Sequence, residues 1–453
     1  MNVAFQTFGC RLNRAEALDH EARLLAKDHV VVPLNGATPP DLIVVRGCSV
    51  TAKAERDCRK AIARLRARFP TARIEITGCL SGNSTPPLPH SPTLNSSLST
   101  LHSSLSTPVP LRTARAYPTI QAGCSGRCSF CIVPSFRGAP RSVPFGQVIA
   151  RAREFLLAGY REIVVTGCNL ALYRDSGHGL ADVLAALATL GTDPTVRVGT
   201  DLKARVGTDP IRSHRVRLSS LEPGVCDAAV LDAFAAHPNI CRFIHLSVQS
   251  GSVPILARMN RPYSIDAVDR FCAKATHALG RRLALGADII TGFPGETEAD
   301  FAATRDFILR HPFTNLHVFP YSERTSTPAA TMDGRVPPAV RRTRARELEN
   351  IGRTKREAFA SSFVGQEVEV CIERNATGWT AEYLKCTIKD FNDFKDFNDF
   401  KDLNDPKDLN DLKDLKDPKD LKEAICRLSR RSLVKARVVS ADGVSLVAIP
   451  SEG

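Results

Sequence analysis

Three cysteines within eight residues constrain this chain more than any other feature of its sequence. Cys124, Cys128 and Cys131 follow a short apolar run at 117–122 with the spacing C-x3-C-x2-C. Three thiolates spaced in this way can hold three irons of a four-iron cluster and leave the fourth iron open to a small molecule. Structural zinc is the competing interpretation, but it takes four ligands, and the nearest His, Asp or Glu is far from Cys131 in the sequence. The pattern therefore predicts an iron-sulfur site with an open position.

The length and charge of the chain limit its class. A chain of 453 residues is too long for one ordinary core, which predicts two or three domains. The net charge of +13 favours a polyanionic partner, although a basic surface also serves solubility. The first residues lack a basic segment followed by an apolar run, and no stretch approaches the roughly 20 apolar residues of a membrane span. We therefore expect a cytoplasmic enzyme without a membrane partner, whose fourteen cysteines are metal ligands or core residues.

Three further cysteines follow three predicted strands of an amino-terminal domain. Strands and helices alternate at 2–8, 12–27, 41–47, 52–69 and 73–78. One cysteine comes directly after each strand: Cys10, Cys48 and Cys79. This order makes the strands parallel and brings the three thiols to the carboxyl edge of one sheet, where α/β folds bind their ligands. A single cysteine at a strand end is more often a small buried hydrophobe, but three in phase predict a second metal cluster.

Two other cysteines are interpreted as packing residues. Cys58 lies on one helical stripe with four apolar side chains, Ala54, Ile62, Leu65 and Phe69. Cys168 follows a predicted strand without an evident partner thiol, which favours a packing role over a redox role.

Strands and helices alternate again from residue 117. Candidate strands lie at 117–123, 161–167, 215–221, 243–249, 283–291 and 315–321. Candidate helices between them include 146–158, 264–279 and 296–310. Six βα units predict a partial (βα)6 barrel, and the polar and glycine-rich residues fall at the strand ends that form the active face of such a barrel. The fold class is therefore α/β.

The carboxy-terminal part of the chain has a different predicted pattern of helices and strands. An arginine-rich helix is expected at 339–360, followed by strands at 363–370 and 378–384 and a hairpin around 441–443, which together predict a small β barrel. Three tracts of unusual composition interrupt the chain. We expect a low-complexity segment at 84–110, a surface insertion at 191–210 and a mobile loop at 389–423. The predicted division is 1–110, 111–347, a connecting helix at 348–362, and 363–453.

The cysteine motifs and their flanks resemble the radical S-adenosylmethionine (SAM) methylthiotransferases over nearly the whole chain. The residues that carry the resemblance are the central triad with Pro134, Phe136, Arg137 and Gly138, and the stretches 7–13 and 48–54. The resemblance implies two 4Fe-4S clusters. One lies on the catalytic triad Cys124, Cys128 and Cys131 and cleaves SAM to a 5′-deoxyadenosyl radical. The other is an auxiliary cluster on the amino-terminal triad and takes part in sulfur delivery.

Residues at the strand ends are candidates to contact SAM. Gly292 and Gly295 allow close backbone approach to a ligand, and Ile290, with its neighbour Ile289, could pack against an adenine. Gln249 and Glu222 could bond the ribose hydroxyls or the amino acid end of SAM, although polar residues at strand ends are often only solvated.

The resemblance also implies partners and a substrate. The carboxy-terminal barrel resembles the TRAM domain, an RNA-binding module, and the enzyme would need a low-potential electron donor of the flavodoxin or ferredoxin type. We expect a monomer. The stretches 48–54 and 317–322 look most like the branch acting on N6-threonylcarbamoyladenosine beside the tRNA anticodon. Alternatives are N6-isopentenyladenosine in tRNA, a ribosomal protein aspartate, and an RNA-binding iron-sulfur protein without turnover.

Overall fold

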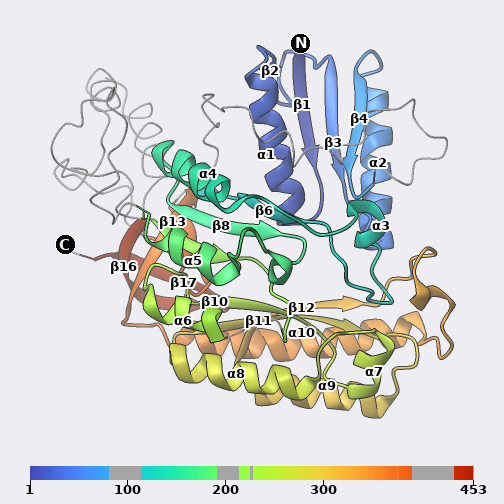
Figure 1. Cartoon of the computed structure of the whole chain (residues 1–453), viewed down its shortest axis with the longest axis vertical. Coiled ribbons are helices and arrows are strands. Elements are labelled where there is room, and N and C mark those ends of the chain that lie inside the picture. The colour runs from blue at the N-terminus through green and yellow to red at the C-terminus, as the bar shows by residue number, and fades with distance from the viewer. Residues whose placement is uncertain (81–113, 191–213, 225–227, 375, 390–432, 452–453) are drawn as a thin grey trace.

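The structure is a computed structural model that describes residues 1–80, 114–190, 214–224, 228–374, 376–389 and 433–451 (Figure 1). The tracts predicted at 84–110 and 191–210, and that at 389–423 except for Lys389, lie outside the described residues. The described residues form an amino-terminal α/β domain, a central partial barrel and a carboxy-terminal β barrel, so the predicted fold class is confirmed. No helix in these ranges is both long and apolar enough to cross a membrane.

The amino-terminal domain is a parallel four-stranded sheet in the order β2-β1-β3-β4. Its strands are β1 (Asn2–Thr7), β2 (Val30–Val31), β3 (Leu42–Gly47) and β4 (Arg73–Gly78). Its helices α1 (Arg11–Leu25) and α2 (Ala52–Arg68) lie on opposite faces (Figure 1). Because side chains alternate along a strand, Ile43 and Val45 of β3 pack with α2, whereas Val44 packs on the side of α1. The short strand β2 was not predicted.

The central unit contains six parallel strands, as the sequence predicts. They are β6 (Thr119–Ala122), β8 (Glu162–Gly167), β9 (Arg215–Leu218), β10 (Phe243–Gln249), β11 (Ala284–Thr291) and β12 (Phe313–Pro320). Strands β6, β8 and β9 pair in one sheet and β10, β11 and β12 in another, and two parallel bridges, Val216 with Ile240 and Leu221 with Leu246, join β9 to β10. The result is a partial barrel. The two-residue strands β5 (Arg115–Ala116) and β7 (Arg141–Ser142) extend its first sheet.

Helices cover the outside of the partial barrel (Figure 1). The long ones are α4 (Phe145–Leu157), α5 (Leu180–Ala188), α6 (Ala228–Ala236), α8 (Ile265–Leu279) and α9 (Glu298–Arg310), and the short ones are α3 (Val133–Arg137) and α7 (Val253–Arg258). Short 3-10 turns lie at Leu170–Leu172 and Pro328–Thr331. Apolar side chains on the outward face of the strands, such as Ile244, Leu246 and Ile289, join those of the helices in the largest core of the molecule. Every second residue of these strands therefore faces the interior of the barrel.

The carboxy-terminal unit is a closed barrel in the order β13-β14-β15-β17-β16. Helix α10 (Pro338–Ser361) leads to it and is continuous across the division predicted after residue 347. The strands are β13 (Glu367–Arg374), β14 (Thr377–Thr380), β15 (Lys385–Ile388), β16 (Leu433–Asp442) and β17 (Ser445–Pro450). The strand predicted at 378–384 is wrong beyond Thr380, because the chain turns there and returns as β15.

The carboxy-terminal barrel closes the amino-terminal end of the central barrel. Arg215 and Arg217, both buried, each ion-pair with Glu162 at 2.6 and 2.7 Å. Their remaining N–H groups donate to backbone carbonyls of the small barrel, Trp379 O at 2.5 Å and Thr380 O at 2.8 Å. Burial alone would raise the pKa of Glu162, but the two guanidinium groups hold this pKa well below its ordinary value. The small barrel is therefore docked on the central barrel through buried hydrogen bonds, although it keeps an apolar core of its own.

Candidate iron-sulfur and SAM site

The central cysteine triad lies in one loop after β6, and each of its sulfur atoms has an N–H donor. Backbone N–H groups of Gly126 and Val133 lie 3.2 and 3.4 Å from the sulfurs of Cys124 and Cys131. Arg261 donates to the sulfur of Cys128 at 2.9 Å. Donors aimed at sulfur stabilise the thiolate form that binds iron.

A second segment, the residues after α7, holds this loop in place. Ser129 donates its backbone N–H to Met259 O at 3.0 Å and its hydroxyl to Arg258 O at 2.8 Å. Asn260, which has a positive φ of 53°, donates to Arg127 O at 2.8 Å. The sequence motif did not reveal these contacts, because they join residues about 130 positions apart.

Burial favours the protonated thiol at two cysteines of the triad when no metal is bound. It raises the pKa of Cys131 to about 11, and it also raises the pKa of Cys128 against the opposing charge of Arg261. Iron must therefore displace protons from these thiols, as metals generally do when they bind cysteine.

The amino-terminal triad gathers at the carboxyl edge of its sheet, as predicted. Cys79 N–H donates to Gly47 O, next to Cys48, at 3.1 Å. Gly9, with a φ of +90°, leaves no room for a side chain, since a Cβ there would lie 3.0 Å from the sulfur of Cys48. Burial raises the pKa of Cys48 to about 11, and the neighbouring charges of Cys79 and Cys10 add to this effect. The strand ends thus bring three residues from distant parts of the sequence to one place.

Arg137 joins the two triads. It belongs to α3, directly after the central cysteine loop, and its Nε lies 3.4 Å from the sulfur of Cys79. Its other nitrogens donate to Asn13 Oδ1 at 2.9 Å and to Glu16 Oε1 at 2.6 Å. One buried guanidinium therefore ties the auxiliary triad to the helix that follows the central triad.

The donor set of each triad suits a four-iron cluster. Each triad supplies three free cysteine sulfurs, and thiolates are the usual ligands of such clusters. Three ligands would leave one iron open, whereas structural zinc takes four ligands.

Two of the candidate SAM residues, Glu222 and Ile290, lie beside the central cysteine loop. Glu222 forms an ion pair with Arg261 at 2.9 Å, so the structure brings it close to Cys128. Gln249 ends β10, largely buried and with a φ of +68°. Ile290 packs in a small apolar cluster with Phe130 of the cysteine loop.

The structure changes the expectation for Ile289 and gives a second reason for the two glycines. Ile289 belongs to the main core, because it lies on the outward face of β11, and it cannot contact an adenine in the barrel as expected. Gly292 and Gly295 have φ values of +69° and +88°, and a Cβ there would lie 2.2 Å from Arg341 Cγ and 2.7 Å from Arg258 Nε. The packing of the chain itself thus requires both glycines, whatever ligand they approach.

Cys58 is placed as expected, whereas the packing role of Cys168 stays a prediction. Cys58 is buried beside Ile62 and Leu65, in the cluster that Ala54 and Phe69 border. Cys168 is half-buried, and burial raises its pKa to about 12. Arg261, by contrast, is a site residue that the sequence analysis missed, because an isolated arginine in the loop between α7 and α8 carries no motif.

The fold and the two triads define a radical SAM enzyme, and comparisons with known proteins agree. Residues 119–308 match the model of the Radical SAM superfamily, and residues 2–95 match that of the Uncharacterized protein family UPF0004. The fold resembles the solved structure of a radical SAM methyltransferase, TsrM, from Kitasatospora setae, with a TM-score of 0.52 and 15% identity over 73% of this chain and 77% of that one.

Curated relatives give the particular family. The threonylcarbamoyladenosine tRNA methylthiotransferase MtaB of Rickettsia prowazekii is 32% identical over 83% of this chain and 89% of its own length. The tRNA-2-methylthio-N(6)-dimethylallyladenosine synthase of Sphingopyxis alaskensis is 29% identical over 82% of this chain and 86% of its own. The chain belongs to the radical SAM tRNA methylthiotransferases and is MtaB-like, and as such it is a sulfur-group transferase that uses SAM and a 4Fe-4S cluster.

Proposed function

We propose that this protein transfers a methylthio group to position 2 of N6-threonylcarbamoyladenosine at position 37 of tRNA. The observation that carries the chemistry is the contact of Arg137 with Cys79, because it places the helix after one cysteine triad against the other triad. A reaction that opens a C–H bond and adds sulfur at the same carbon needs both functions at one place. The substrate is proposed from the relatives named MtaB, which reach 32% identity.

The residues of the central site bind and orient SAM. The cysteine triad would hold a cluster that supplies the electron for cleavage of SAM, and Arg261 and Glu222 lie beside Cys128. We assign Glu222, Gln249, Gly292, Gly295 and Ile290 to SAM binding. Gln249 and Gly292 are buried and the other three are partly buried, which would limit access of water to a ligand whose radical would otherwise react with it.

The amino-terminal residues would hold a second 4Fe-4S cluster. Cys10, Cys48 and Cys79 fit such a cluster by their donor set of three thiols, and this cluster would carry the sulfur that is transferred. The protein would act as a monomer in the cytoplasm with a flavodoxin or ferredoxin as electron donor.

The TRAM-like barrel would add affinity for tRNA. Lys385, Lys435 and Arg437 project from its exposed surface, and basic contacts to phosphate make binding weaken steeply with salt.

N6-Isopentenyladenosine in tRNA is the second candidate substrate, because a relative with that activity in its name is 29% identical. The experiment is expression in cells that lack their own enzyme for this step, followed by mass spectrometry of nucleosides from total tRNA. We expect the 2-methylthio derivative of N6-threonylcarbamoyladenosine. The isopentenyl derivative in its place would establish the second candidate, and a modified ribosomal protein with unmodified tRNA would refute both. Absence of 5′-deoxyadenosine from reconstituted, reduced protein with SAM would show a binder without turnover.

A further inference from the structure

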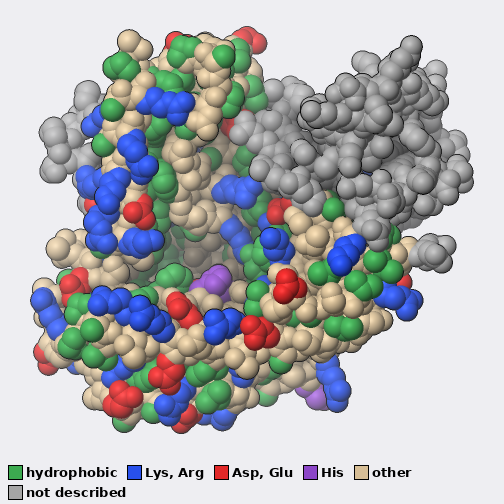
Figure 2. Space-filling model, turned by 180° about the vertical axis from the view of Figure 1, so that it is seen from behind, with side chains coloured by type: hydrophobic (Ala, Val, Ile, Leu, Met, Phe, Trp, Pro, Cys, Tyr) green, Lys and Arg blue, Asp and Glu red, His purple; other side chains and the backbone are tan. Residues whose placement is uncertain are grey.

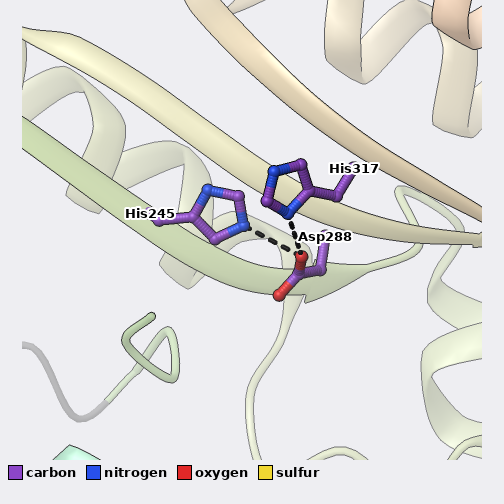
Figure 3. Close-up of side chains that lie close together, drawn as sticks. All are labelled: His245, Asp288 and His317. Atoms are coloured by element: carbon purple, nitrogen blue, oxygen red, sulfur yellow. Dashed lines mark hydrogen bonds and ion pairs between the residues drawn. The ribbon is translucent and has the colours of Figure 1, made fainter. Parts of the chain in front are cut away.

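A cluster of three polar side chains lies inside the central barrel and has no role in the chemistry above (Figure 3). His245 of β10, Asp288 of β11 and His317 of β12 come from three neighbouring strands. His245 Nε2 and His317 Nδ1 lie 2.9 and 3.2 Å from the same oxygen, Asp288 Oδ1. The two imidazole rings are 4.6 Å apart.

The cluster breaks the apolar character of these strands. The outward residues of β10, Ile244, Leu246 and Val248, are all buried in the main core. The inward positions of the same strand include His245 and Ser247, and the Ser247 hydroxyl lies 3.5 Å from Asp288 Oδ2. Since buried polar groups need partners, a polar lining inside a barrel indicates a polar ligand.

The cluster is fixed on one side. Arg356 of α10 donates to Asn315 Oδ1 at 2.7 Å, and Asn315 Nδ2 then faces His317 Nε2 at 3.4 Å. The His245 side chain is 3% exposed and pairs with Asp288. Burial would raise the pKa of Asp288, but hydrogen bonds from the two imidazoles hold it well below its ordinary value. The carboxylate therefore stays ionised and holds both rings in place.

The cluster is open on the other side. The His317 side chain is 48% exposed, and the side chain of Asp288 is 20% exposed. Figure 2 shows a hollow in the molecule with a histidine at its floor and Lys and Arg side chains around it. Within the cluster a ligand can reach His317 first, because its side chain is the most exposed of the three.

We propose that His317, Asn315 and Asp288 form the binding site for the polar substituent on N6 of the substrate adenosine. This inference rests on the proposed function and deepens it. A threonylcarbamoyl group carries a carboxylate and a hydroxyl. The amide N–H of Asn315 can donate to the carboxylate, and His317 Nε2 and Asp288 Oδ2 can accept from the hydroxyl, because the Nδ1–H of His317 already donates to Asp288.

The same site disfavours a prenyl substituent. An isopentenyl group is a hydrocarbon, and it would displace water from the cluster without replacing the hydrogen bonds. A site built to bond a polar group rejects an analogue that lacks it, because its own polar groups are left unpaired. His317 and Asn315 would thus select between the two candidate tRNA substrates.

The test replaces His317 with leucine in the full-length protein reconstituted with its clusters. Methylthio transfer is measured on anticodon stem-loops that carry either N6-threonylcarbamoyladenosine or N6-isopentenyladenosine at position 37. In His317→Leu we expect kcat/KM for the first substrate to fall about 10- to 100-fold, mainly through KM, as for removal of a hydrogen-bond partner that leaves polar groups unpaired. We expect the ratio of isopentenyl to threonylcarbamoyl turnover to rise by the same factor.

His311→Leu is the matched control, because His311 also bonds a carboxylate, that of Asp269, but lies at the end of α9 outside the barrel. It should leave both activities within about twofold of the unsubstituted protein, as expected of a substitution away from the site. Asn315→Leu should repeat the shift seen with His317→Leu. Iron content and melting temperature report whether each variant folds. If His317→Leu does not fold, the result with Asn315→Leu tests the proposed binding site in its place.

Three results would overturn the inference. Equal loss of both activities would make His317 structural, and no loss would place the substituent elsewhere. One equivalent of zinc or manganese per chain that is bound by the unsubstituted protein and lost in His317→Leu would make the cluster a metal site. If the unsubstituted protein modifies only the isopentenyl stem-loop, the proposed function fails first; if it modifies the threonylcarbamoyl stem-loop and His317→Leu does so equally well, this inference alone fails.

Discussion

The two cysteine triads of this protein are built in opposite ways. The central triad lies within eight consecutive residues, and two of its three sulfur atoms take backbone N–H donors from the loop itself, Gly126, and from the first residue of the helix that follows, Val133. The amino-terminal triad comes from three strand ends, at positions 10, 48 and 79, and its sulfur donor Arg137 belongs to another domain. The first site is largely local, whereas the second exists only when the sheet has formed and the next domain has docked.

This difference predicts different tolerance to change. A local loop can keep its shape when distant contacts weaken, because its own backbone supplies most of the donors. A site assembled from separate elements depends on every contact that holds those elements in register. Substitutions outside the cysteines should therefore disturb the amino-terminal triad more than the central one.

The largest expected effect is the loss of SAM cleavage when a cysteine of the central triad is replaced. Cys124→Ala, Cys128→Ala or Cys131→Ala should lose about half of the iron and reduce reductive cleavage of SAM below detection, since each thiolate is needed to leave one open iron. Iron, acid-labile sulfide and 5′-deoxyadenosine are measured together. Cys272→Ala, in the core of the central barrel, is the control and should retain both clusters. Normal 5′-deoxyadenosine from any of the three variants would refute the assignment of the central site.

The second prediction concerns the amino-terminal triad and is the counterpart of the first experiment. Replacing Cys10, Cys48 and Cys79 together with alanine should also remove about half of the iron, but cleavage of SAM should remain measurable while methylthio transfer stops. The same assays are used, with mass spectrometry of the tRNA nucleosides. A triple variant with full iron content and unchanged product would mean that these thiols only pack.

A third experiment tests the dependence of the amino-terminal triad on its surroundings. Asn13 is buried and donates to Phe8 O at 2.8 Å and to Gly47 O at 3.1 Å, beside two of the triad cysteines. Asn13→Ala should destabilise the amino-terminal domain by about 2 to 3 kcal/mol, because buried backbone carbonyls lose their donors. Thermal unfolding and iron content are the measurements, and iron should be lost from the auxiliary site first. Asn35→Ala, on the surface, should cost less than about 0.5 kcal/mol. Equal losses in the two variants would contradict the assembled character of this site.

The smallest expected effect is on the reduction potentials of the two clusters, and it compares Arg137 with Arg261. A guanidinium that donates to a ligand sulfur favours the reduced, more negative cluster, so its loss should lower the reduction potential. Arg137→Gln should lower the potential of the auxiliary cluster, and Arg261→Gln that of the central cluster, each by on the order of 50 mV, which corresponds to about 1 kcal/mol for one electron. Redox titration followed by electron paramagnetic resonance measures both clusters in one sample. Arg305→Gln on the surface of α9 is the control. A shift of both potentials in either variant would show that the arginines do not act on separate sites.

Much of this protein could be predicted from its sequence. The alternation of apolar runs and helices indicated both α/β units, and five of the elements of the amino-terminal domain lie where they were expected. Both triads stood out because cysteines at fixed spacing, or in phase at strand ends, are rare by chance. Strand alternation is also visible in the sequence, and His245 and Asp288 could have been noticed as polar interruptions of two apolar strands.

What the sequence by itself determined are the features set by neighbours along the chain: the helices, the strands, the cysteine loop, and the family that these motifs identify. The tertiary structure alone decided which distant residues meet. It placed Arg261 on Cys128 and Arg137 on Cys79, and it turned Ile289 outward into the core. The physical reason is that hydrogen bonds and burial act over a few ångströms in space, so their partners depend on how strands pair and helices pack and not on sequence spacing.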